Sequence, residues 1–552
     1  MAESLTNAAA APTGRDSPPP DRSELDGRSQ LIPRRRIQAA TWAAVAAVIA
    51  GTAVRVWFLL TPAGSLLDAD QAATGLMARR MLHGQDFYTY FAGQNYNAAI
   101  EQYLQTAMYW LLPIPETPFT LRLVPVFLGA LVTWFIYLVG ARMLPNRWLA
   151  AMAAMLFAFG PFHNVLKGTH SDGAYPSTQL LVVVGLDAAL RLRGDGSRRD
   201  VLWSALLGLV TGLTIWCGLT GLFVLVPVAL WAAPLVFRSW YAVGAGTLAA
   251  VAGASPTLAW LWSTGTFPGP GPQPPVSLRD RMINVFGVLT REFIGVGQIS
   301  GRPGWPLKLQ YLALVVVLGG WLIAVIRRRQ GILALLTFQT RWGRKPVDIL
   351  LVAVALGWIG LAVSHYSWYT ETPRYLFVLY PLYPLLLAAC VPVRAARSVT
   401  VVTAATLTVV FVVSSLVQLT TYRAAGPREE TYRKVAAALV AAGQTNVYGD
   451  YWRVIPLEYF SPDVQINAAP LGVGGGKFPE EHAQVDNAPT FAYIADAADL
   501  KAKKGIAAEL RRRNISFTPT VIDSLVIYTD LSRYPKPWDI GLGQKGPPGP
   551  GG

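Results

Sequence analysis

The stretch LLDADQAATGLMARRMLHGQDFYTYFAGQNYNAAIEQYL, residues 66–104, directly follows an apolar run that ends at Leu60. Two carboxylates, Asp68 and Asp70, stand one residue apart where the chain leaves that run, and Glu101 follows about thirty residues later. Residues 72–82 carry apolar side chains at helical spacing, which predicts a short helix on a membrane surface. Carboxylates beside a bilayer are costly, so this loop is the first candidate for a functional site.

An alternative is that Asp70 only caps the predicted helix, because Asp accepts hydrogen bonds from the free N–H groups of a first turn. A cap explains one carboxylate. It does not explain Asp68 or Glu101. Nor does it explain the aromatic residues between Asp70 and Glu101, which are Phe87, Tyr88, Tyr90, Phe91 and Tyr96. We therefore favour a site that binds a substrate at the membrane surface.

The composition is that of a polytopic membrane protein. Of 552 residues, 53% are hydrophobic and only 14% are charged, and the mean hydropathy is +0.36. The net charge of +15 comes from basic clusters between apolar segments, which indicates membrane topology and not nucleic-acid binding. The two cysteines, Cys217 and Cys390, lie in apolar segments and predict no disulfide framework.

Apolar periodicity predicts about eleven membrane spans. The basic linkers between them fall on one side, so the N-terminus is expected in the cytosol and the 61–118 loop outside the cytoplasmic (inner) membrane. The first span is interpreted as a signal anchor, with a cleaved signal peptide as the alternative. The expected spans are 37–60, 119–143, 148–162, 176–190, 201–217, 219–237, 241–263, 306–326, 347–365, 375–391 and 399–419.

The chain divides into four parts. Residues 1–36 read as a disordered cytosolic tail, and 37–420 as the membrane domain with long outer loops at 61–118 and 264–305. Residues 421–540 alternate helix-like and strand-like segments, which predicts a small extracytoplasmic α/β domain. The Gly/Pro-rich residues 541–552 are expected to be disordered.

The string DADQAATGLMARRMLHGQDF, followed by GQNYNAAIEQYL, resembles the first outer loop of bacterial GT-C glycosyltransferases related to the dolichyl-phosphate-mannose protein mannosyltransferase family. The resemblance implies a multi-span enzyme that moves a sugar from a polyprenyl-phosphate carrier to an acceptor outside the membrane. Family members carry an Asp-Glu pair whose Asp is the catalytic base. Asp70 falls on that Asp, with Asp68 as the second candidate, whereas Gln71 stands where the Glu would be.

Cations near the outer ends of spans are candidates for binding the donor phosphate. Lys167 and His170 lie in NVLKGTHSDGAYP, and Arg374 lies in PRYLFVLYP, a string that also resembles the family. The alternative is that each is an interfacial anchor. Glu101 and Arg122 are assigned to acceptor binding or support of the site.

The Asp-x-Asp spacing of Asp68 and Asp70 is compatible with a divalent metal, Mg or Mn. A lipid monophosphate leaving group, however, has less need of a metal than a nucleotide diphosphate. The sequence thus predicts an inverting glycosyltransferase with a polyprenyl-phosphate sugar donor, a glycan, lipid or protein acceptor, and Asp70 as base. A transporter or flippase of lipid-linked sugars and a non-catalytic membrane scaffold are the alternatives. A transporter would predict two related halves, and the sequence shows no convincing internal repeat.

Overall fold

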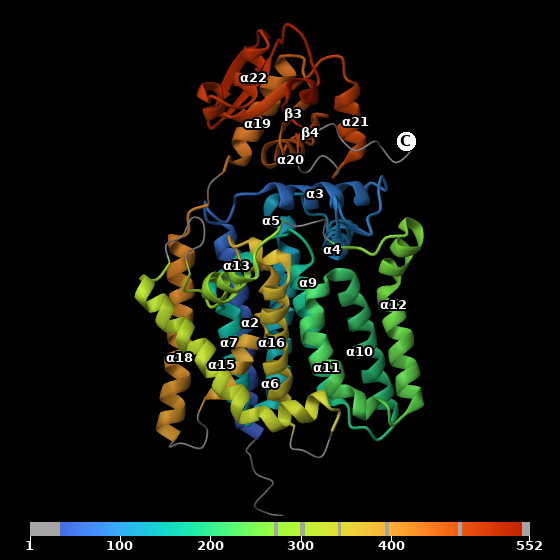
Figure 1. Cartoon of the computed structure of the whole chain (residues 1–552), viewed down its shortest axis with the longest axis vertical. Coiled ribbons are helices and arrows are strands. Elements are labelled where there is room, and N and C mark those ends of the chain that lie inside the picture. The colour runs from blue at the N-terminus through green and yellow to red at the C-terminus, as the bar shows by residue number, and fades with distance from the viewer. Residues whose placement is uncertain are drawn as a thin grey trace, which may run out of the picture.

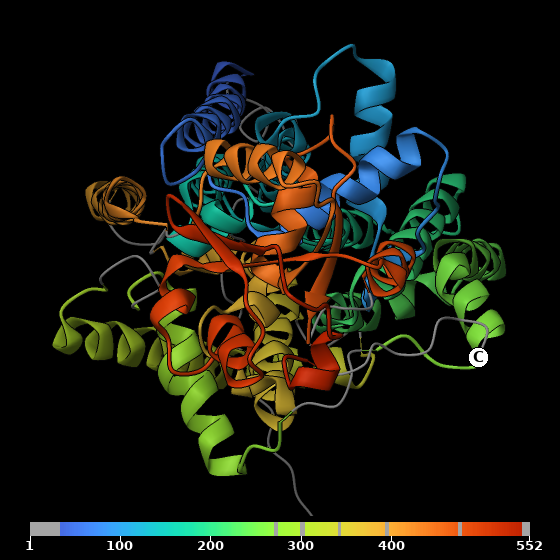
Figure 2. The same ribbon diagram turned by 90° about the horizontal axis from the view of Figure 1, so that it is seen from above.

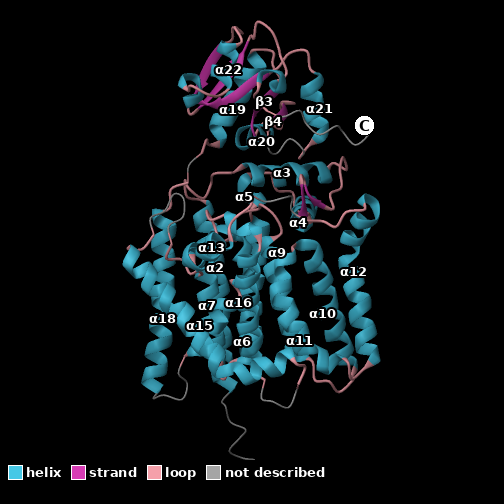
Figure 3. Cartoon of the chain, viewed as in Figure 1, coloured by secondary structure: helices cyan, strands magenta, loops and turns pink. Residues whose placement is uncertain are grey.

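The computed structural model describes residues 34–269, 274–297, 304–339, 344–391, 397–424, 426–472 and 477–543. Most of the two tails expected to be disordered, 1–36 and 541–552, lies outside these ranges. A bundle of helices carries a small α/β domain at one end, and helix α3 lies across that end between the two (Figure 1). We call this end of the bundle the α3 end. The strands gather in the α/β domain and in one hairpin beneath α3 (Figure 3).

Eight helices in the described ranges are long and apolar enough to cross a membrane. The chain is therefore a multi-pass helical membrane protein. The eight segments are formed by α2 (Arg34–Leu59), α6 (Leu123–Met143, preceded by α5, Pro118–Leu121), α10 (Arg198–Cys217), α11 (Leu222–Val236, preceded by η1, Leu219–Gly221), α12 (Trp240–Thr264), α15 (Leu307–Leu336), α16 (Pro346–Val363) and α18 (Arg397–Thr421).

The expected count of eleven spans matches only roughly, because the other three segments are short or broken. Helix α7 (Arg147–Phe159) ends at Gly160, which has φ +41° and precedes Pro161. Helix α9 (Tyr175–Arg191) has 17 residues. The expected span 375–391 is divided at Pro381 into the 3₁₀ segment η4 (Arg374–Leu379) and α17 (Leu382–Cys390).

The connections at the α3 end form short elements of their own. The 61–118 loop contains α3 (Ala69–Leu82), the antiparallel hairpin of β1 (Tyr90–Phe91) and β2 (Gln94–Ala98), and α4 (Ile100–Leu111). The 264–305 loop contains α13 (Leu278–Met282), the π-helix η2 (Ile283–Leu289) and α14 (Thr290–Phe293). Helix α8 (Phe162–Lys167) and η3 (His365–Trp368) complete this layer.

The C-terminal domain is built on a five-stranded sheet of order β4-β3-β5-β7-β6. Strands β4, β3 and β5 are parallel, and β7 and β6 continue the sheet as an antiparallel hairpin. Seen from above, the domain lies over the middle of the bundle (Figure 2). Its elements are α19 (Glu429–Ala441), β3 (Asn446–Asp450), α20 (Tyr451–Tyr459), β4 (Asn467–Leu471), α21 (Pro479–Asn487), β5 (Ala492–Asp496), η5 (Ala497–Lys501), α22 (Ile506–Arg512), β6 (Thr518–Ile522), β7 (Leu525–Thr529) and η6 (Pro537–Ile540).

Helix α3 is shared between the two parts. The helix expected at 72–82 forms, but ten of its 14 residues are buried, because the C-terminal domain covers the face that a membrane-surface helix would expose. Leu76 packs in one apolar cluster with Val454 and Tyr459 of α20, and Gly75 lies so close to Tyr459 that a Cβ there would come within 2.3 Å of its ring. The domain is thus fixed to the loop that carries the two acids.

Candidate active site

The two acids at the start of α3 have different local roles. Asp68 is the N-cap of the helix, and its Oδ1 accepts a hydrogen bond of 2.9 Å from the N–H of Gln71. The alternative that Asp70 only caps the helix is therefore wrong. Asp70 lies in the first turn, where its negative charge interacts favourably with the helix dipole.

The carboxylate of Asp70 is held by the C-terminal domain. Its Oδ1 accepts hydrogen bonds of 2.7 Å from the Tyr451 hydroxyl and 2.7 Å from the Lys477 ammonium, and Lys477 also donates to the Tyr451 oxygen. Burial alone would raise the pKa of Asp70. The charge of Lys477 and the hydrogen bonds from Lys477 and Tyr451 outweigh burial and hold that pKa below its usual range.

Asp68 meets two side chains from the segment between α8 and α9. One ligand atom each of Asp68, His170 and Asp172 lie within 4.8 Å of one another. Within the described ranges, His170 Nδ1 and Asp172 Oδ1 are buried without hydrogen-bond partners. Burial and the cations Lys167 and Arg122 hold the pKa of His170 well below its usual value, so its imidazole is neutral and can donate a lone pair. Burial, then the charges of Asp172 and Asp70, raise the pKa of Asp68.

This set fits a divalent cation better than the pair expected from the Asp-x-Asp spacing. Asp70 is engaged by Lys477, whereas Asp68, His170 and Asp172 offer two carboxylates and one imidazole to a common point. Carboxylate oxygens with an imidazole nitrogen suit Mn²⁺ or Zn²⁺ more than Mg²⁺, which prefers oxygen ligands.

Lys167 places a positive charge beside the acids. It lies at the end of α8 and donates to Asp172 Oδ2. Burial disfavours its charged form, but Asp172 and Asp68 outweigh burial and raise the pKa of Lys167. It also lies within electrostatic range of Asp70 and of Arg374. The predicted phosphate-binding lysine therefore lies in the same cluster as both predicted acids.

Arg122 supports the loop that leads to the acids. It is 1% exposed and donates a 2.6 Å hydrogen bond from Nε to Gln71 Oε1, and its terminal nitrogens donate to the carbonyls of Gly64 and Leu66. Gln71, which replaces the Glu of the family pattern, is thus a buried neutral acceptor for this arginine. The two residues hold the backbone on either side of Asp68.

Glu101 lies apart from these contacts, on the buried side of α4. Its Oε1 accepts from the Ser177 N–H at 3.2 Å and from the Ser177 hydroxyl at 3.0 Å. Burial raises the pKa of Glu101 to about 8, although the Ser177 hydrogen bonds oppose the rise. At neutral pH Glu101 is therefore mainly protonated, and it supports the junction between α4 and α9.

Arg374 lies beside an aromatic cavity at the α3 end. Its guanidinium stacks 3.7 Å from the ring centre of Tyr369. Tyr96 lies within electrostatic range of both Arg374 and Asp70, so it connects the arginine to the acids. The cavity has a volume of about 290 Å³ and an aromatic and polar lining that includes Tyr96, Asn97, Tyr175, Trp216, Tyr366 and Tyr375.

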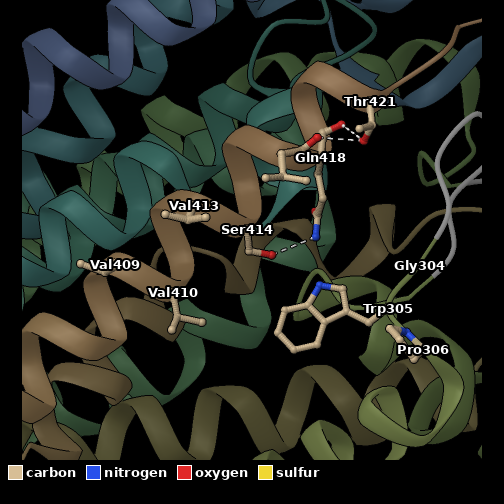
Figure 4. A pocket seen from close by; sticks show the side chains of 10 residues that line it. Gly304, Trp305, Pro306, Val409, Val410, Val413, Ser414, Gln418 and Thr421 are labelled. Carbon is tan, nitrogen blue, oxygen red and sulfur yellow. Dashed lines mark hydrogen bonds between the residues drawn. The ribbon is translucent and has the colours of Figure 1, made fainter.

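A second cavity lies between α18 and the start of α15. This groove of about 560 Å³ is lined by residues of α18, four of them valines, and by Gly304, Trp305 and Pro306 (Figure 4). It reaches Thr421, and the next residue, Tyr422, lies within electrostatic range of Asp68 and Lys167. Each cavity is thus linked to the acids through one tyrosine, the groove through Tyr422 and the aromatic cavity through Tyr96.

Three residues of this cluster had no signal in the sequence strong enough to assign them. Tyr451 and Lys477 contact Asp70 across 381 and 407 residues of sequence, which no local pattern encodes. Asp172 follows Lys167 and His170 in the sequence without a motif of its own, and the structure shows its proximity to Asp68 and His170.

Comparison with known proteins identifies the architecture. No family model and no curated protein sequence matches the chain. Among solved structures, it is similar to ArnT from Cupriavidus metallidurans bound to undecaprenyl phosphate, with a TM-score of 0.51 and 12% identity over 89% of this chain and 98% of that one. The apo form of the same protein aligns with a TM-score of 0.50 and 14% identity over 92% and 100% of the two chains.

An oligosaccharyltransferase from Archaeoglobus fulgidus in its apo form has a TM-score of 0.50 and 12% identity, over 85% of this chain and 71% of that one. At these identities the similarity concerns the fold. The alignments with ArnT cover most of this chain and nearly all of the other one, so the shared fold is not confined to a part of either protein. The chain therefore has the fold of the GT-C membrane glycosyltransferases.

Proposed function

We propose that the chain is an integral membrane glycosyltransferase that moves a sugar from a polyprenyl-phosphate donor to an acceptor hydroxyl at the α3 end. The observation that carries this proposal is the partly buried cluster of Asp68, Asp70 and Asp172 with Lys167, at the α3 end of a bundle with the GT-C fold. A partly buried group of mixed charges near cavities is typical of a reaction centre.

In the proposed reaction, Asp70 takes the proton of the acceptor hydroxyl. The acceptor oxygen forms a bond to the anomeric carbon of the donor sugar, while the bond from that carbon to the phosphate oxygen breaks. The electron pair leaves with the lipid phosphate, and the configuration at the anomeric carbon is inverted. Arg374 and Lys167 offset the negative charge that develops on the leaving phosphate, and Asp68 is the second candidate for the base.

The two cavities suit the two halves of such a donor. The groove between α15 and α18 is apolar and runs along helices that are largely exposed on the outside of the bundle, as an isoprenoid chain requires. The cavity beside Arg374 has a largely apolar and aromatic lining. It includes tyrosines, whose rings can pack on the C–H faces of a sugar, and Asn97, whose amide can bind hydroxyls. A phosphate between them would meet Lys167 and Arg374.

A divalent cation would be held by Asp68, His170 and Asp172, and would supply positive charge next to the phosphate. We further propose that the α3 end faces outside the cytoplasmic membrane. Arginines such as Arg142, Arg191 and Arg199 gather around a cavity at the far ends of α6 and α9, and the N-terminus of α2 lies at that same end (Figure 1).

The test is sugar transfer from radiolabelled polyprenyl-phosphate sugars by the purified full-length chain in lipid vesicles. Asp70→Asn should lower the turnover at least about a hundred-fold, because a general base typically contributes a factor of 10² to 10⁴. Asn keeps an oxygen that can accept from Tyr451 and Lys477, so the fold should persist. Undiminished transfer by the variant would remove Asp70 from the mechanism. Lipid translocation without any transfer would favour a transporter.

A further inference from the structure

The C-terminal domain contributes two side chains to the surroundings of Asp70. The hydroxyl of Tyr451 and the ammonium of Lys477 both lie 2.7 Å from the same carboxylate oxygen, and they are hydrogen-bonded to each other. Tyr451 opens helix α20, and Lys477 precedes α21. Two donors of the C-terminal domain therefore converge on one oxygen of Asp70.

Lys477 is built into this position and is not a surface lysine that happens to reach Asp70. Its side chain is only 6% exposed, and its ammonium lies 4.5 Å from the ring centre of Phe91 and 4.4 Å from that of Tyr451. A buried ammonium is costly without a counter-charge, and Asp70 supplies it. Two aromatic faces and two hydrogen bonds hold the ammonium in one place.

The hairpin of the first outer loop is shaped to admit this lysine. Gly93 has φ +71°, which favours glycine, and a Cβ at this position would come within 2.7 Å of Lys477 Cγ. The turn between β1 and β2 therefore depends on glycine both for its backbone and for the stem of the lysine. A residue of the 61–118 loop and a residue of the C-terminal domain thus fit each other next to Asp70.

We propose that Lys477 and Tyr451 are positioning residues of the reaction centre, which the C-terminal domain supplies to hold the carboxylate of Asp70 in one orientation. This inference rests on the proposed function, in which Asp70 is the base. It gives the C-terminal domain a part in the reaction, because without these two donors the carboxylate could rotate away from the acceptor. A misplacement of about 1 Å of a reacting group can lower a rate about a hundred-fold.

A purely structural role for the ion pair is the competing explanation, and the chain provides a matched control for it. Arg80, at the other end of α3, donates to Glu458 at 3.2 Å and also binds Glu481, so it attaches the same helix to the same domain. Ten residues of helix separate it from Asp70 by about 15 Å. Arg80→Gln weakens the attachment without touching Asp70.

The experiment compares Lys477→Met, Lys477→Arg, Tyr451→Phe and Arg80→Gln as full-length proteins in the transfer assay. Lys477→Met should lower kcat about 10- to 100-fold with the KM for the lipid donor within about two-fold, because it affects the base and not donor binding. Lys477→Arg should retain more activity than Lys477→Met, because it keeps the charge and the donors. Tyr451→Phe should lower kcat less than Lys477→Met does. Arg80→Gln should keep kcat near that of the wild type.

A double-mutant cycle gives a readout that does not depend on transfer. Asp70→Asn, Lys477→Met and the double variant are compared by their thermal unfolding midpoints, and the double variant should lose less than the sum of the single losses. Additive losses would overturn the inference. A wild-type kcat in Lys477→Met, or an equal kcat loss in Arg80→Gln, would overturn it while Asp70 remained the base. Absence of transfer by the wild type would instead remove the proposed function, and the inference with it.

Discussion

Asp70 at the α3 end and Asp187 near the far end of α9 each bind two cationic or hydroxyl donors, but they do so differently. Asp187 uses both oxygens, accepting from Arg142 at 2.5 Å and from Arg191 at 2.7 Å, and its side chain is 4% exposed. Asp70 receives both of its donors on Oδ1 and is 23% exposed. A carboxylate engaged on both oxygens has little capacity left for a ligand.

The surroundings of the two acids extend this difference. Beside Asp70, the described residues leave buried polar atoms without partners on His170 and Asp172, and Lys167 lies 5.9 Å from the ring centre of Tyr175, which lines the aromatic cavity. Beside Asp187, both arginines are engaged by that one carboxylate. Burial of charge alone therefore does not mark a functional site in this protein. A cavity adjoins the arginines of Asp187 as well, so open space does not distinguish the two places, whereas unsatisfied acceptors do.

The largest expected effect tests whether the role of Asp187 is structural. Breaking a buried ion pair typically costs roughly 3–5 kcal/mol. Asp187→Asn should lower the free energy of unfolding by an amount near the low end of this range, because both arginines are partly exposed. Turnover per folded molecule should stay that of the wild type. Thermal unfolding in detergent measures the loss, and the exposed Arg327→Gln is the control. An unchanged midpoint would contradict the structural role.

The next effect tests whether the free acceptors bind a cation. Asp172→Asn should weaken Mn²⁺ binding by roughly 10- to 100-fold, which is the usual consequence of altering a metal's immediate surroundings. Free Mn²⁺ can be measured directly by electron paramagnetic resonance during titration of the purified protein. Asp187→Asn should leave this binding unchanged. Equal binding by the Asp172 variant and the wild type would exclude the set of Asp68, His170 and Asp172 as the site.

A smaller effect tests the cations at the two ends. Arg374→Lys keeps the charge but loses the planar guanidinium that stacks on Tyr369, so the KM for the lipid donor should rise about ten-fold. Arg191→Lys, at the far end, should leave that KM unchanged. Steady-state transfer at varied donor concentration measures both. An equal KM in all three proteins would show that Arg374 is an interfacial anchor only.

Local sequence singled out Asp70 as a candidate but could not predict its partners, and it gave no signal for Asp187. Apolar periodicity located the bundle, and Asp68 and Asp70, which follow the first span, lie in the layer at the α3 end. The eleven predicted spans and the eight long apolar helices of the described ranges agree only roughly, because α7 and the segment before α17 are apolar but end at Gly160 and Pro381. The contact of Asp70 with Tyr451 and Lys477 depends on how two domains pack, and periodicity within either segment carries no information about it.

The smallest expected effect distinguishes two acids at the same end. Glu101 has a pKa of about 8 when folded and near 4.5 when exposed, so the folded state retains a proton that the unfolded chain has lost between these pH values. Stability contributed by Glu101 should therefore fall as pH rises from 4.5 to 8 and then level off.

Glu101→Gln lacks this dependence, because the amide does not titrate. Between pH 5 and pH 8.5, the wild type should lose more thermal stability than the variant, as unfolding midpoints in detergent would show. Transfer by Glu101→Gln at pH 7 should be nearly that of the wild type. Parallel pH trends of the two proteins would mean that Glu101 is ionised when folded. Lys477 keeps Asp70 ionised, so Asp70→Asn should lose transfer, whereas Glu101→Gln should keep it. The two variants therefore separate a carboxyl that the fold keeps neutral from one that it keeps charged.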